Sequence, residues 1–255
     1  MNIDIQKAKE EFLKYTENYE LENPNIKRKQ QHSLRVMQIC GEIAKGEGFS
    51  EGEVELAKLI GLLHDIARFK QYTEYKTYKD SQSFDHGDMG VEILKDNNYI
   101  RNFIQDKEYD DIIKKSIKNH NKYEIEEGLS DIEERFCKII RDADKLDIFY
   151  EAIEMFWHDE KEEIENSEIS EDIQEQFYKK RTINRKEIRN NNMINKVVVI
   201  IAFIFDINYK TSFQKIQKEK YIDKIIDRFD FKKENTKEVI EEIRKFANEY
   251  VLEKI

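Results

Sequence analysis

Histidine is the residue type best placed to do chemistry in this chain, because four of its five copies fall on apolar helix faces. Each of the four is in register with the apolar residues of a predicted helix, at or near one end of it: His32, His64, His86 and His120. The fifth, His158, lies in the charged stretch HDEKEE and is predicted to be exposed. A single inward histidine is typical of a core imidazole bonded to a backbone carbonyl. Four on four helices instead predict a cluster, and neutral imidazoles beside a carboxylate make a metal site.

The stretch LAKLIGLLHDIARFKQ, residues 56–71, contains the first candidate carboxylate. Asp65 directly follows His64 near the end of an almost wholly apolar helical run. A charged carboxylate in a buried stretch is costly unless it is paired or bound to a metal ion. We therefore expect a cation next to Asp65.

A second carboxylate is expected from RDADKLD, residues 141–147, within a long predicted helix. At about 100° per residue, Asp144 and Asp147 share one flank of that helix, and Asp142 lies on the other flank. An acid on a helix flank is also typical of a solvated or salt-bridged residue. Spacing alone does not choose between Asp144 and Asp147 as the further ligand.

The elements that must position these side chains are predicted to be helices. The 255 residues include eight glycines and one proline, and good helix formers are common, so we expect an all-α chain of long helices and short polar loops. Capping signals at Ser50, Asp85 and Ser130 open three of the helices. Helices are expected over 4–20, 24–45, 50–67, 86–97, 107–120 and 130–157, with a polar loop over 70–84.

The C-terminal third is predicted to be a helical extension. Residues 159–192 are highly charged and are expected to be exposed helix and loop. The run VVVIIAFIF, residues 197–205, could form a buried strand, but its all-helical surroundings favour a buried helix. The segments 213–229 and 236–254 are amphipathic.

Composition excludes several classes of function. The net charge of −10 argues against binding nucleic acid as a polymer, which needs a basic surface. The N-terminus lacks an apolar signal core, and the longest apolar run is far short of the roughly 20 residues that span a bilayer. Cys40 and Cys137 lie far apart and are expected to be reduced, buried thiols. We expect a cytoplasmic protein without a membrane segment, and the sequence does not predict its oligomeric state.

The order of the candidate ligands resembles that of the HD-domain superfamily of metal-dependent phosphohydrolases. His32, then the pair His64-Asp65 in LLHDIARF, then Asp144 in ADKLD carry the resemblance, which covers about residues 25–155. It implies an HD-domain helical bundle over 25–155, with residues 1–24 packed on it as an N-terminal helix and 156–255 as the C-terminal helical extension.

The resemblance also assigns roles that spacing leaves open. It gives the acidic ligand role to Asp144. Asp142 and Asp147 are left as residues that could contact the ligands without binding the ion. Two histidines fall where the two-metal branches of the superfamily carry two extra ones. The implied ligands are His32, His64, Asp65, His86, His120 and Asp144, with Asp65 bridging two ions.

Such a site implies hydrolysis of a small phosphate ester or anhydride, with a nucleotide as the expected substrate. Nitrogen and oxygen ligands together favour one or two divalent ions of Mn, Fe, Co, Ni or Zn, and a bridging hydroxide would attack phosphorus. Asp65 and Arg68 are the expected catalytic residues. Arg68, Arg35 and Lys145 lie close in sequence to the ligands and are the candidates for holding substrate, although each could instead form a surface ion pair.

Other functions are compatible with the same ligand order. Some two-metal HD proteins are di-iron oxygenases, and pocket residues rather than ligands separate them from hydrolases. A further alternative is an HD module that binds a nucleotide without turnover, and a purely structural helical protein is the least favoured. His120 is followed by NKYEIEEG, without the Gly-Tyr-Pro triplet of the HD-type cyclic-di-GMP phosphodiesterases.

Overall fold

The computed structural model describes residues 3–184 and 192–255, and every regular element within these ranges is a helix. The predicted all-α class is confirmed. The chain divides into two compact units, the first ending at Asp144 and the second running from Lys145 to Ile255. The long helix α7, Asp131–Glu154, contributes to both units.

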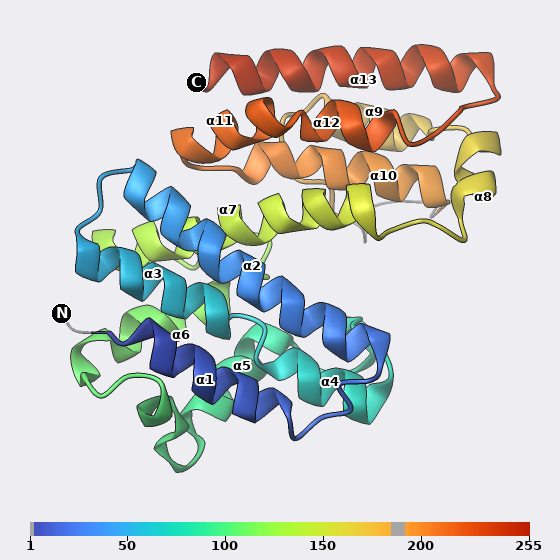
Figure 1. Cartoon of the computed structure of the whole chain (residues 1–255). Coiled ribbons are helices and arrows are strands. Elements are labelled where there is room, and N and C mark those ends of the chain that lie inside the picture. The colour runs from blue at the N-terminus through green and yellow to red at the C-terminus, as the bar shows by residue number, and fades with distance from the viewer. Residues whose placement is uncertain (1–2, 185–191) are drawn as a thin grey trace. The chain divides into compact units, whose positions relative to one another are not determined.

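The first unit is built from the helices that carry the candidate site (Figure 1). Before α7 they are α1 (Ile5–Thr16), α2 (Pro24–Gly46), α3 (Glu51–Leu63), α4 (Ala67–Tyr75), α5 (His86–Lys95) and α6 (Asp110–Asn119). Their starts follow local signals. Asn23 caps α2 ahead of Pro24, Ser50 and Glu53 form a complete capping box at α3, and the Asp85 side chain caps α5.

Helix α3 lies at the centre of the first unit, in contact with α1, α2 and α6. Five of its apolar residues are fully buried, as expected of a core helix: Leu56, Leu59, Ile60, Leu62 and Leu63. Helices α2 and α3 run side by side and approach closely at Gly61 (Figure 1). A Cβ atom there would lie 2.8 Å from the Cys40 sulfur and 3.0 Å from the Val36 carbonyl oxygen.

The predicted helix over 50–67 is interrupted. Helix α3 ends at Leu63, a turn of three residues follows, and α4 begins at Ala67. The polar loop predicted over 70–84 is wrong at its start, because α4 continues to Tyr75. Packing overrides the weak periodicity here, since Phe69 and Gln71 are fully buried. The remainder of the segment contains a short 3₁₀ turn, Asp80–Gln82.

The connection between α5 and α6 is irregular. It contains the 3₁₀ elements η2 (Asp96–Asn102) and η3 (Lys107–Tyr109), so the helix predicted from residue 107 begins at Asp110 instead. Asn97 and Asn98 adopt left-handed backbone conformations with φ of 47° and 59°. Asparagine tolerates this region better than other non-glycine residues.

The second unit contains the remaining helices. They are α8 (Lys161–Asn166), α9 (Glu171–Phe177), α10 (Met193–Ile201), α11 (Lys210–Glu219), α12 (Tyr221–Ile226) and α13 (Glu234–Glu253). The run 197–205 forms the end of α10 and a 3₁₀ turn, which confirms the helical prediction over a strand. The charged stretch 159–192 is less exposed than predicted, because Ile164, Ile173 and Phe177 anchor α8 and α9 in the core. Its residues 185–191 lie outside the described part of the chain.

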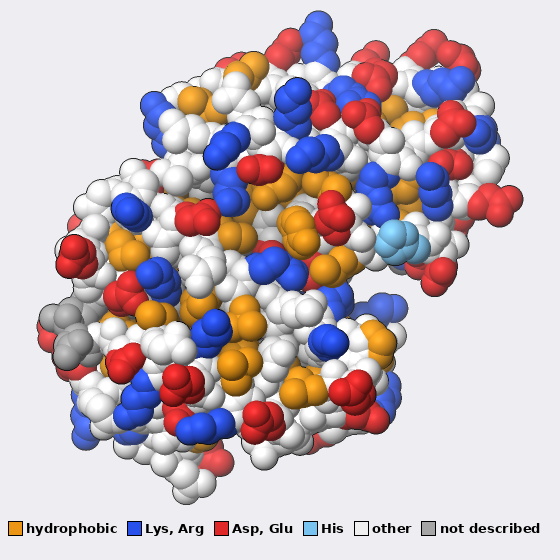
Figure 2. All heavy atoms as spheres, in the orientation of Figure 1, with side chains coloured by type: hydrophobic (Ala, Val, Ile, Leu, Met, Phe, Trp, Pro, Cys, Tyr) orange, Lys and Arg blue, Asp and Glu red, His pale blue; other side chains and the backbone are white. Residues whose placement is uncertain are grey.

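Charged side chains of both signs are exposed on the face of the molecule that Figure 2 presents. Figure 2 shows Lys and Arg side chains interspersed with Asp and Glu side chains across the face that it presents. None of the described helices combines the length and apolar character that crossing a membrane requires.

Candidate metal centre

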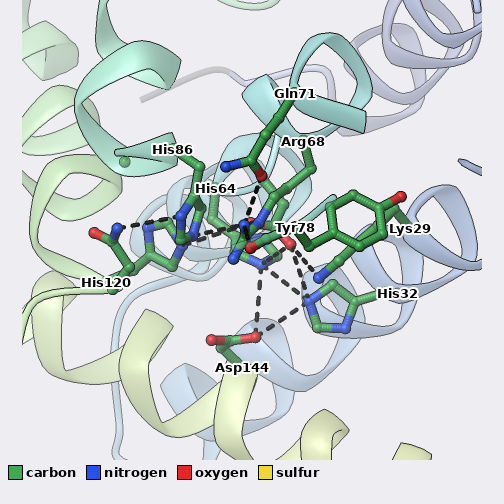
Figure 3. A network of polar contacts seen from close by, with 12 residues as sticks. Lys29, His32, His64, Arg68, Gln71, Tyr78, His86, His120 and Asp144 are labelled. Atoms are coloured by element: carbon green, nitrogen blue, oxygen red, sulfur yellow. Dashed lines mark hydrogen bonds and ion pairs between the residues drawn. The ribbon is translucent and has the colours of Figure 1, made fainter. Parts of the chain in front are cut away.

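The four inward histidines and two aspartates meet at one place in the first unit (Figure 3). The ends of helices supply most of them. His64 and His120 are the C-cap residues of α3 and α6, His86 is the first residue of α5, and Asp65 lies in the turn after α3. The other two lie within long helices, His32 on α2 and Asp144 on α7. All four histidines and Asp65 are buried.

Three of these residues form one possible ion site, here called the His32 group: His32, His64 and Asp144. The His32 Nε2 atom lies 3.2 Å from His64 Nε2 and 3.1 Å from Asp144 Oδ1. The Oδ2 atom of Asp65 is 3.5 Å from His32 Nε2 and 3.6 Å from His64 Nε2. Donor atoms this close together, on residues of these types, could hold a metal ion.

The other two histidines form a second cluster, here called the His86 group: His86 and His120. Their Nε2 atoms are 3.0 Å apart, and they lie 3.5 Å and 3.6 Å from the Oδ1 atom of Asp65. Asp65 therefore presents one carboxylate oxygen to each group. Figure 3 shows the His86 group at the left of the network, His32 at the right and Asp144 below them.

Hydrogen bonds at Nδ1 orient three of the rings. His64 Nδ1 donates to the Gly61 carbonyl at 2.8 Å, and His120 Nδ1 donates to the Ile117 carbonyl at 2.6 Å. A carbonyl oxygen can only accept, so the proton is on Nδ1 and the Nε2 lone pair is free to bind a metal. His86 Nδ1 lies 2.6 Å from the Asp80 carboxylate, which fixes the same tautomer.

Comparison with known families bears on this cluster directly. Residues 30–148, which include all six candidate ligands, match the family model of the HD domain. Over these residues the chain is similar to an HD domain. HD domains belong to a superfamily of metal-dependent phosphohydrolases. No curated protein and no solved structure matches the chain.

The donor set of the HD domain fits divalent metal ions. Imidazole nitrogens and carboxylate oxygens together suit first-row transition metals. Burial lowers the pKa of His64 and lowers that of His86 to about 4, so both rings are neutral near pH 7, as ligands must be. Burial opposes the charged form of Asp65 and Asp144. At Asp65, Lys29 and Arg68 outweigh burial, and at Asp144 the contacts with the His32 and His64 rings outweigh it, so the pKa of each carboxyl lies well below its usual range.

Two cations lie against the HD-domain aspartate. Lys29 Nζ is 2.7 Å from Asp65 Oδ2, and Arg68 Nε is 3.3 Å from Asp65 Oδ1. Arg68 was predicted at the site, whereas Lys29 was not. The sequence feature that could have identified Lys29 is its position three residues before His32, which puts the two side chains on one side of α2. The cation expected next to Asp65 is thus in part provided by the protein.

The remaining predicted residues have different surroundings. Arg35 is half-buried on α2, and Asp142 and Asp147 are buried on α7. Lys145 pairs with Asp206 in the second unit at 2.6 Å. The expected substrate contacts of Arg35 and Lys145 stay predictions. His158 is exposed, as predicted.

Residues from the segment after α4 also reach the HD site, and sequence analysis did not find them. Asp80 contacts His86, and the Tyr78 carbonyl accepts from Arg68 Nη1 at 2.7 Å. From a different segment, directly after His120, Asn121 donates to Asp80 at 3.2 Å. Neither periodicity nor a motif marks these residues, because their contacts depend on the path of an irregular segment.

Proposed function

We propose that the chain is a metal-dependent phosphohydrolase that cleaves a small phosphate ester or anhydride, with a nucleotide as its substrate class. The observation that supports this most directly is the shared carboxylate of Asp65. One oxygen faces the His32 group and the other faces the His86 group. This arrangement suits two ions bridged by one ligand.

The residues divide between the two ions as follows. His32, His64, Asp144 and Asp65 would hold the first ion, and His86, His120 and Asp65 would hold the second. When bound, such ions supply an activated water near neutral pH and neutralise charge on phosphate oxygens.

Lys29 and Arg68 add fixed positive charge beside the ligands. Their side chains are 12% and 14% exposed, so they are largely shielded from bulk water. Arg68 Nη1 donates to Gln71, to the Tyr78 carbonyl and to Asp80, which holds the guanidinium in place. A preoriented cation stabilises the negative charge that develops on a phosphate in the transition state.

The two thiols are poorly suited to act as nucleophiles. Cys40 and Cys137 are both buried. Burial raises the pKa of Cys137 to about 11 and raises that of Cys40 well above its usual range. Both are therefore neutral near pH 7, and a thiol in that form is unreactive. This supports attack by water rather than by a cysteine.

Elemental analysis of protein purified without added metal or chelator tests the proposal, followed by phosphate release from a panel of nucleotides. We expect about two transition-metal ions per chain and metal-dependent phosphate release. Asp65→Asn should lose both, and His86→Ala should lose one ion and most activity. His158→Ala replaces the exposed histidine and should match the wild type in both measurements.

Three results would contradict the proposal. Folded protein that binds no metal after reloading with Mn²⁺ or Fe²⁺ would remove its basis. Metal-loaded protein that binds a nucleotide tightly and forms no product over hours would be a binding module. Iron-loaded protein that consumes oxygen with small polyols or organophosphonates, without releasing phosphate, would be an oxygenase.

A further inference from the structure

One carboxylate outside the predicted ligand set contacts a candidate ligand, His86, at the ring nitrogen that faces away from the other ligands. Asp80 begins the 3₁₀ turn between α4 and α5, and its side chain is 31% exposed. Its Oδ2 atom accepts from His86 Nδ1 at 2.6 Å. Its Oδ1 atom accepts from Arg68 Nη1 at 3.0 Å and from Gln71 Nε2 at 2.9 Å.

His86 needs such a partner because of its place in its helix. The Nδ1 atoms of His64 and His120 donate to carbonyls three residues earlier, so the preceding helical turn orients each ring. His86 is the first residue of α5 and has no preceding turn. Its ring is therefore oriented from outside the helix, by a residue of the preceding loop.

Asp80 is itself held in position. Gln71 is fully buried, and its Nε2 atom also donates to the Ser83 hydroxyl at 2.8 Å and to the Phe84 carbonyl at 3.1 Å. Arg68 is fixed by the Tyr78 carbonyl. The carboxylate thus has a defined place relative to His86, and a charged acceptor behind a histidine increases the basicity of the opposite ring nitrogen.

We propose that Asp80 is a positioning residue that sets the metal affinity of the His86 group, with little effect on the His32 group. The inference rests on the proposed two-ion centre. It makes the two halves of that centre unequal, because one histidine of the His86 group depends on a loop carboxylate. The Nδ1 atom of His64, by contrast, donates to a carbonyl of its own helix.

Calorimetric titration of metal-free protein with Mn²⁺ tests this. The wild type should show two binding events. Asp80→Asn keeps an acceptor but removes its charge, and should weaken one event about 10- to 100-fold, as loss of such a partner typically does. The other event should stay unchanged.

Asp80→Glu keeps the charge but displaces the carboxylate, and should weaken the same event. Asp88→Asn removes an exposed carboxylate from the same region, on α5, and should change neither.

The outcomes separate this inference from the proposed function. Two unchanged events in both Asp80 variants, or equal weakening of both events, would overturn the role of Asp80 alone. A wild type that binds no Mn²⁺ would overturn the two-ion centre as well. Thermal unfolding of the metal-free variants provides a second readout. A general structural role would lower their midpoints, whereas a positioning role leaves them close to the wild type.

Discussion

The positive charge that compensates the Asp65 carboxylate should change when an ion binds. Lys29 and Arg68 lie next to its two oxygens and compensate its charge. Once an ion is bound, the same carboxylate acquires a second source of positive charge. Lys29 should therefore matter most for stability when the metal is absent.

Replacing Lys29 with Met tests this at the residue scale. We expect the metal-free variant to lose about 1–3 kcal/mol of unfolding free energy, because a buried charge loses a partner. The loss should be smaller with Mn²⁺ bound, since the ion takes over part of the compensation. Urea unfolding with chelator and with metal measures both values. Lys27→Met, at an exposed position on α2, is the control, and an equal loss in both metal states would contradict the prediction.

The histidines of the site could be predicted from sequence because each is in helical register with apolar residues, which indicates that it lies on the buried face of its helix. The exposure of His158 was predicted on a different ground, the charged stretch HDEKEE in which it lies. Periodicity could not choose between Asp144 and Asp147, which share a flank. It also says nothing of Asp80, whose contact with His86 arises from the path of an irregular segment.

At the scale of elements, the approach of α2 to α3 sets the spacing between His32 and His64. Gly61 permits that approach and also accepts the Nδ1 hydrogen bond of His64. Helix starts were predictable because capping residues mark them, as at Ser50 and Asp85. The end of α3 at Leu63 was not, because it falls within an apolar run that carries no glycine or proline at that point.

Gly61→Ala tests the importance of this contact. Alanine favours an isolated helix by up to about 1 kcal/mol, but its Cβ would meet the backbone of α2. We expect a net loss of about 1–3 kcal/mol from overpacking and weaker Mn²⁺ binding by the His32 group. Urea unfolding and calorimetry measure the two effects. Gly41→Ala, at a position where the three atoms nearest to the new Cβ all belong to the flexible Lys58 side chain, is the matched control. Stability and binding like the wild type's would contradict the prediction.

At the scale of the whole molecule, the candidate ligands come from segments spread along almost all of the first unit. The first ion would join α2, the end of α3, the turn after it and α7, and the second ion would join that turn to α5 and the end of α6. A ligand that binds only the folded state stabilises it by about 4 kcal/mol when present at 1,000 times its dissociation constant.

Metal binding should therefore raise the unfolding midpoint and slow amide hydrogen exchange in α2, α5 and α6. Helices α11–α13 of the second unit contain no candidate ligand, so hydrogen exchange in these helices is the internal reference. Mass spectrometry of samples with Mn²⁺ and with chelator measures both regions. Equal slowing in both regions, or none in the first unit, would contradict this expectation.

The left-handed pair Asn97–Asn98 lies in the chain between His86 and His120, in an exposed part of the connection after α5. A protease that cut the backbone there would leave the two histidines on separate fragments. Asp65 and His86 would remain on the N-terminal fragment, and His120 and Asp144 on the C-terminal one. Each half of the centre would then draw its ligands from both fragments, so a bound ion would act as a crosslink that a chelator reverses.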